Sequence, residues 1–175
     1  RMVHVVYYRS PYAHARIVSI DDTAALACPG VVRVISGKEV AEVCTPWVGT
    51  LAHFKGMKSA PQHALAVERA CWQGEPIAAV VANSRAEAED AVQLIEVEFE
   101  ELPVLADPEV AMDDDTPVMH PDLGDNLLFE MNHDIGDTAA AFAAADKIVE
   151  RTLDFGRHTG VCPESRSIIA DYTAS

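Results

Sequence analysis

The sequence predicts an α+β fold built on a mixed sheet with a βαβ unit, and three observations support this class. Residues 77–82 form an unbroken apolar run with the length of a strand buried on both faces. Apolar residues then recur at helical spacing, and residues 96–100 alternate between acidic and apolar side chains, as in a strand with one solvent-facing side. Strand, helix and strand joined by short turns favour a right-handed βαβ crossover.

The elements before this unit are short and separated by turn residues. Asp21 or Asp22 can cap a brief helix that Pro29 and Gly30 end. Apolar and β-branched residues on either side of this helix predict strands. The predicted strands are residues 2–8, 16–20 and 31–35.

The helix of the βαβ unit has a clear start and a clear buried face. Ser84 is a suitable N-cap residue, and Glu87 three positions later predicts a capping box. Apolar residues follow at i, i+3, i+4 and i+7, which places them on one side of a helix. The predicted buried face consists of Ala88, Ala91, Val92 and Ile95.

Residues 107–126 are rich in Pro, Asp and Gly and predict a long surface loop or a linker. We therefore expect one domain over residues 1–125 and the start of a second, truncated domain over residues 126–175. In the second part, Asp137 is expected to cap a helix over residues 138–145. The predicted strands there are residues 127–133, 147–155 and 168–172. Apolar strands at both ends of the chain lead us to expect a segment excised from a longer polypeptide.

The composition excludes several classes of partner. The chain has 175 residues and a formal net charge of −15, which argues against binding to nucleic acid or to an anionic membrane. Its apolar runs are much shorter than the roughly 20 residues that cross a bilayer. Its four cysteines include no C-x-x-C pair, so neither an iron-sulfur cluster nor a zinc knuckle is indicated. We expect free thiols and a reducing cytoplasm, although two disulfides remain an alternative.

Residues 158–164 contain the one group that could suggest nucleophilic catalysis. His158, Cys162 and Glu164 lie within seven residues, and a Cys-His pair oriented by a carboxylate is conceivable. The favoured interpretation is a polar loop in which Glu164 and Arg166 pair with each other or with another part of the protein. We expect Cys162 to take no part in chemistry.

A second group, His120, Asp122 and Asp125, invites a metal-binding interpretation. Its spacing matches no recognised ligand pattern, so solvated loop residues are the better interpretation. The sequence therefore gives no catalytic, cofactor-binding or metal-binding residue.

Residues 43–67 contain no acidic residue, although the whole chain is strongly acidic. Loops with aromatic and basic groups are common at interfaces and at the mouths of substrate channels. A surface loop that packs its own aromatic residues is the alternative. The candidates for interface or substrate-channel contact are Trp47, Phe54, Lys55, Lys58, Gly74, Glu164 and Arg166. Of these, Gly74 has the makings of a tight turn before a buried strand.

A series of motifs resembles the α/β hammerhead domain of the molybdenum hydroxylases, the family of xanthine dehydrogenase, aldehyde oxidase and carbon monoxide dehydrogenase large subunits. The motifs are RSPYAHARI at residues 9–17, PGVV at 29–32, GEPIAAVVA at 74–82, EVEFEELP at 96–103 and GD at 136–137. The resemblance implies a hammerhead domain over residues 1–125 and the first strands and helix of a molybdopterin-binding domain after it. Glu164 and Arg166 also match a Glu-Pro-Arg-like turn of the family, with Ser165 in place of its proline.

The resemblance implies a function for the intact protein rather than for this segment. That function is hydroxylation of an aldehyde or N-heterocycle with water as the oxygen source, at a molybdenum centre held by a pterin. The implied partners are the remainder of the large subunit and iron-sulfur (2Fe-2S) and FAD subunits or domains, with a small-molecule substrate. The segment itself is expected to be structural, interface-forming and inactive alone. The alternative is a stand-alone, non-catalytic binding or assembly module on a hammerhead scaffold.

Overall fold

The computed structural model describes residues 2–156, 160, 162–164 and 166–173. The chain divides into two compact units, Arg1–Met131 and Asn132–Ser175. Among the described residues, all six strands lie in the first unit, and the second contains one helix. The domain boundary expected after residue 125 lies close to this division and remains a prediction.

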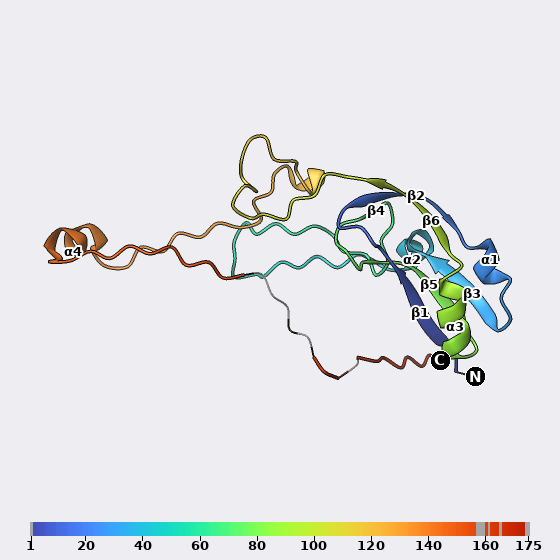
Figure 1. Cartoon of the computed structure of the whole chain (residues 1–175). Helices are drawn as coiled ribbons and strands as arrows, with labels where there is room; N and C mark the ends of the chain where they lie inside the picture. The colour runs from blue at the N-terminus through green and yellow to red at the C-terminus, as the bar shows by residue number, and fades with distance from the viewer. Residues whose placement is uncertain (1, 157–159, 161, 165, 174–175) are drawn as a thin grey trace. The chain divides into compact units, whose positions relative to one another are not determined.

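The first sheet has the strand order β1-β5-β3, and both of its pairings are antiparallel. These strands are β1 (His4–Arg9), β5 (Pro76–Ala82) and β3 (Val31–Ser36). Helix α3 (Arg85–Val92) packs against this sheet (Figure 1). The predicted helix face is confirmed, because Ala88, Ala91, Val92 and Ile95 are all buried in one cluster with Val80.

The second sheet has the order β4-β2-β6 and is also antiparallel. It consists of β4 (Arg69–Ala70), β2 (Ala15–Asp21) and β6 (Glu96–Glu101). The predicted alternation in β6 is confirmed, since Val97 and Phe99 are half-buried while Glu96, Glu98 and Glu100 are exposed. Sequence alone did not predict the two-residue strand β4.

The α+β class is confirmed, but the mixed sheet and the βαβ crossover are wrong. Strand β5 is central in its sheet, and β1 and β3 occupy both of its edges. Strand β6 therefore pairs with β2 in the other sheet, so α3 connects two sheets instead of two parallel strands. The succession strand, helix, strand was predicted correctly, and the partner of the last strand was not.

Side-chain caps fix the starts of the three longest helices among the described residues. In α3, Ser84 Oγ accepts a hydrogen bond from Glu87 N at 3.3 Å, as predicted. The capping box is only half formed, because the Glu87 carboxylate accepts from the Ser84 hydroxyl at 2.8 Å rather than from its backbone. A complete capping box starts α2 (Gly37–Val43), where Ser36 and Glu39 bond each other reciprocally, although we did not predict this helix. The brief predicted helix is α1 (Thr23–Leu26).

The second unit contains the predicted helix as α4 (Thr138–Ala144), with Asp137 as its cap. The strands predicted at residues 127–133, 147–155 and 168–172 are wrong for the described residues, which form no strand there. A strand is stable only when its backbone pairs with a neighbouring strand, and all pairings in the described chain involve residues before 102. Within the described residues, no helix is both long enough and apolar enough to span a bilayer.

Candidate functional site

Two of the motifs that carry the family resemblance, at residues 9–17 and 74–82, lie side by side in the first unit. Strand β1 pairs with β5 along its length, and Ser10 N donates to Glu75 O at 2.9 Å beyond its end. Gly74 N donates to Ser10 O at 2.8 Å, and Arg9 Nη1 donates to Gly74 O at 2.8 Å. Gly74 has φ +92°, a conformation that favours glycine, so its turn role has a physical cause.

Next to this turn lies a cleft of about 410 Å³. Its polar lining combines acidic, basic and imidazole groups with one thiol. The lining residues are Ala60, Pro61, His63, Ala66, Val67, Glu68, Arg69, Cys71, Glu75, His120, Pro121, Asp122 and Leu123. Seven titratable side chains, those of His63, Glu68, Arg69, Cys71, Glu75, His120 and Asp122, therefore line one cleft.

Cys71 and Glu75 form the wall of the cleft beside the turn. Cys71 N donates to Glu75 Oε2 at 2.6 Å. Burial raises the pKa of Glu75, and backbone hydrogen bonds from Cys71 and Trp72 oppose the rise. Burial also raises the pKa of the Cys71 thiol, the Glu75 charge adds to the rise, and Arg69 opposes it. A thiol held in its protonated form is a poor nucleophile, so this pair does not resemble an activated cysteine.

His120 lies on the other wall of the cleft. Burial lowers its pKa, and the neighbouring charges of Arg69 and His14 lower it further, while Asp122 opposes them. His14 is 7% exposed, and its Nδ1 lies 2.7 Å from Pro103 O. Its Nε2 is buried and has no hydrogen-bond partner within the described part of the chain. Burial, the Arg69 guanidinium and the His14 imidazole therefore favour the neutral form of His120.

The metal-binding interpretation of residues 120–125 finds no support in this geometry. His120 and Asp122 line the cleft, whereas Asp125 is paired with Lys58. No group of three or more His, Cys, Asp or Glu side chains among the described residues is arranged to hold a metal ion. The interpretation as solvated loop residues is too simple for His120, which is partly buried.

The loop over residues 43–67 joins α2 to β4, and its described part forms no helix or strand beyond the last residue of α2 (Figure 1). One antiparallel bridge holds it, in which Trp47 and Gln62 exchange backbone hydrogen bonds of 2.8 Å. The side chain of Trp47 is 64% exposed, and Lys55 is exposed as well. These two side chains are therefore available for contact with a partner.

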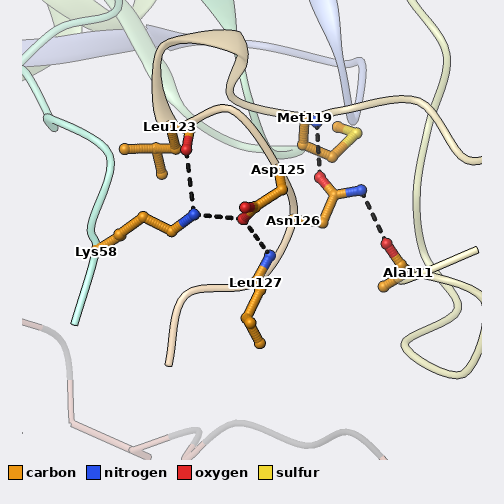
Figure 2. A network of polar contacts seen from close by, with 7 residues as sticks. All are labelled: Lys58, Ala111, Met119, Leu123, Asp125, Asn126 and Leu127. Atoms are coloured by element: carbon orange, nitrogen blue, oxygen red, sulfur yellow. Dashed lines mark hydrogen bonds and ion pairs between the residues drawn. The ribbon is translucent and has the colours of Figure 1, made fainter. Parts of the chain in front are cut away.

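Lys58, by contrast, fastens the loop to residues 123–128. Lys58 Nζ donates to Leu123 O at 3.1 Å and to the Asp125 carboxylate (Figure 2). Lys58 N donates to Leu128 O at 2.8 Å. Asp125 also accepts from Leu127 N at 3.0 Å. The hydrogen bond from Lys58 is the main cause that lowers the pKa of Asp125.

The side-chain amide of Asn126 joins the end of this segment to residues 111–119 by hydrogen bonds. Its Oδ1 accepts from Met119 N at 2.9 Å, and its Nδ2 donates to Ala111 O at 3.0 Å (Figure 2). Nδ2 also donates to Pro117 O at 3.1 Å. Phe54 packs against Phe129 with ring centroids 4.6 Å apart. The loop thus combines both interpretations: Phe54 and Lys58 pack within the unit, while Trp47 and Lys55 face solvent.

Glu164 and Arg166 lie in the second unit and are exposed. Arg166 Nη2 lies 4.0 Å from Cys162 Sγ, and no ion pair between Arg166 and Glu164 occurs among the described residues. His158 and Ser165 lie outside the described residues, so the Cys-His grouping and the Glu-Pro-Arg-like turn stay predictions.

Sequence reasoning missed the cleft, because its walls come from residues far apart in the chain. Arg69, Cys71 and Glu75 meet His120 across about fifty residues, and no spacing rule links them. One available signal was Glu75, a carboxylate between a turn glycine and a fully apolar strand, where burial is expected.

Comparison with known proteins gives a consistent result. Residues 1–103 match the family described as aldehyde oxidase and xanthine dehydrogenase, a/b hammerhead domain. The chain is 34% identical over 172 residues to the nicotine 6-hydroxylase large subunit of Paenarthrobacter nicotinovorans, covering 97% of this chain and 21% of that protein. It is 34% identical over 152 residues to the xanthine dehydrogenase molybdenum-binding subunit of Escherichia coli O157:H7, covering 85% and 20%.

Among solved structures, quinoline 2-oxidoreductase from Pseudomonas putida 86 is 47% identical, with a TM-score of 0.62 over 65% of this chain and 14% of that one. The chain thus spans about one fifth of the length of the curated relatives that it matches. The family match and these similarities place the chain in the aldehyde oxidase and xanthine dehydrogenase family, with its hammerhead domain at residues 1–103.

Proposed function

We propose that this chain forms the hammerhead region of the large subunit of a molybdenum-dependent oxidoreductase, which hydroxylates an aldehyde or N-heterocycle with water. The observation that carries the proposal is the 34% identity to a hydroxylase large subunit over 97% of this chain. Two relatives are named for nicotine and quinoline, which supports a nitrogen-containing aromatic ring as the substrate class.

In this proposal the chain is a scaffold, and other parts of the enzyme hold the cofactor. The molybdenum-pterin group would supply the oxidation of the substrate carbon. The described residues do not fit that group, because they offer no cluster of metal ligands and the cleft thiol is held protonated. The proposed 2Fe-2S and FAD partners follow from the family resemblance, and the proposed cytoplasmic location follows from the expected free thiols.

The exposed side of the loop at residues 43–67 is the proposed contact with the rest of the enzyme. Trp47 is 64% exposed, and nearby Val48 and Leu51 are 48% and 49% exposed. Large apolar side chains exposed together on one loop are typical of protein interfaces. Gly74, Glu164 and Arg166 remain candidates for such contacts, with Glu164 and Arg166 exposed in the second unit.

The test is to express the 175 residues alone and in frame with the coding sequence that flanks them, in a host that makes molybdopterin. We expect molybdenum and turnover of quinoline, nicotine or an aldehyde only in the longer protein. Stoichiometric molybdenum in the 175-residue chain would contradict the scaffold role. A longer protein without molybdenum would contradict the family function and favour a non-catalytic module.

A further inference from the structure

A second hollow, of about 440 Å³, lies where the two strands β2 and β4 meet α2. Three of its lining residues are cationic, and one, Glu68, is acidic. The lining residues are Arg16, Ile17, Lys38, Val67, Glu68, Arg69 and Leu102. A local excess of positive charge is unexpected in a chain with a formal net charge of −15.

The register of the second sheet determines the positions of the two arginines. Arg16 is directly opposite Arg69 in the antiparallel ladder between β2 and β4. Side chains of directly opposed residues lie on the same face with Cβ atoms about 5 Å apart, and like charges in these positions are destabilising. The register therefore places both arginines on one face of the sheet, where Arg69 also lies near Cys71 and His120 of the first cleft.

Lys38, the third cation, lies at the hollow because the backbone of α2 packs closely against the chain before β4. A Cβ atom at Gly37 would lie 2.0 Å from Ala66 O, so the start of α2 rests directly on the chain that leads into β4. Lys38 follows Gly37 and is exposed at the rim of the hollow. Only glycine permits this approach, because any side chain would collide with a backbone carbonyl.

The acidic neighbours do not neutralise this group. Glu100 pairs with Arg16 at 3.1 Å, with both side chains more than half exposed (53% and 58%), and exposed pairs of this kind contribute little. Among the residues that the structure describes, Lys38 and Arg69 enter none of the four ion pairs. Glu68 lines the hollow and is exposed, and within the described part of the chain its carboxylate enters no ion pair.

We propose that this hollow binds a small oxyanion, a phosphate or carboxylate group, between Arg16, Arg69 and Lys38. Guanidinium groups match phosphate and carboxylate with two parallel hydrogen bonds each, and a lysine adds a mobile charge at the rim. A bound anion would also reduce the local excess of positive charge in the lining. The proposal does not depend on the enzyme's function, because binding is measured on the chain without cofactor.

The experiment titrates inorganic phosphate and succinate separately into the 175-residue chain at low salt, by calorimetry and by NMR of the arginine Nε–H groups. For at least one anion, Arg69→Gln is expected to weaken binding about tenfold or more, since a charge-assisted hydrogen bond contributes about 1.5–3 kcal/mol. Arg85→Gln is the matched control, because Arg85 is exposed on α3 and paired with Glu89 away from the hollow.

Each outcome decides the proposal. Phosphate binding that Arg69→Gln weakens identifies a phosphate site, and the same pattern with succinate alone identifies a carboxylate site. If Arg69→Gln fails to fold by circular dichroism, Lys38→Gln at the exposed rim serves instead, with an expected loss of severalfold. Binding of neither anion, or equal losses in the hollow variants and in Arg85→Gln, would overturn the proposal.

Discussion

Strand β6 and residues 147–155 have a similar alternating pattern of apolar and polar residues, yet only β6 forms a strand. In β6, Val97 and Phe99 face the interior because β2 lies alongside and pairs with the backbone from Asp21 to Ala15. Residues 147–155 form no strand, and Leu153 is 91% exposed. Alternation predicts which side chains would share a face of a sheet, and a neighbouring strand decides whether the sheet forms.

The sharpest way to test this contrast is to make the same substitution in both regions. Ile77 in β5 is 0% exposed, so Ile77→Ala should lower the free energy of unfolding by about 2–5 kcal/mol. Ile168 is 94% exposed, so Ile168→Ala should change it by less than about 0.5 kcal/mol. Urea unfolding followed by circular dichroism measures both, and equal losses would mean that the second region is packed in solution.

Substitution of Gly37 and of Gly156 compares close backbone packing in the first unit with open space in the second. Gly37→Ala should cost about 1–3 kcal/mol, because the new methyl group would lie 2.0 Å from Ala66 O and the chain must shift. Gly156 has open space around it, so Gly156→Ala should leave stability unchanged or slightly higher. Thermal unfolding of the two variants separates these outcomes, and a neutral Gly37→Ala would argue against close contact of α2 with residues 65–66.

Helix caps provide a smaller effect of the same kind. Ser84→Ala removes the cap of α3, which packs on the first sheet, and should cost about 1 kcal/mol of global stability. Asp137→Ala removes the cap of α4 and should reduce only the helical signal of that helix. A global loss from Asp137→Ala as large as that from Ser84→Ala would show that α4 contributes to the stability of the core.

The smallest expected effect is the pH dependence of stability that arises from His120 and Glu75 in the cleft. The pKa of His120 is lowered in the folded chain, so the unfolded chain takes up its proton first as pH falls below about 6.5. Stability should therefore decrease as pH falls from that value through the folded pKa. The raised pKa of Glu75 acts oppositely, because its contribution is present below its unfolded value and is lost as pH rises through its folded pKa.

His120→Gln should remove the decrease in stability below about pH 6.5, and Glu75→Gln should remove the loss at higher pH. His133→Gln, at an exposed histidine of the second unit, is the control and should leave the profile unchanged. Unfolding midpoints measured from pH 4 to pH 8 give both profiles. A profile of His120→Gln identical to that of the parent chain would contradict the burial of this imidazole.

Local signals in the sequence predicted most elements of the first unit. Ser84 and the spacing of Ala88, Ala91 and Val92 predicted α3 and its buried face correctly, because these features act within one helix. The pairing of β6 with β2 could not be predicted, since it depends on β1 and β3 already occupying both edges of β5.

For the candidate interface residues, too, the sequence could not predict contacts between distant parts of the chain. Trp47 and Lys55 are exposed, as an interface would require. Lys58 is instead paired with Asp125, more than sixty residues later in the chain. Aromatic and basic composition identified the loop, but it could not identify the hydrogen-bond acceptors of Lys58. The cleft around Glu75 and the opposed arginines depend on strand register and loop packing, which no single stretch of sequence encodes.

The decisive measurement is amide hydrogen exchange of the 175-residue chain alone and of the same residues within the longer protein. We expect strong protection in β1, β5 and β3 in both samples, because these strands already pair with one another. We propose that residues 147–155 exchange rapidly in the chain alone and become protected in the longer protein by pairing with strands from its other parts. Protection of residues 147–155 in the chain alone, or its absence in both samples, would contradict the proposal that this region awaits its strand partners.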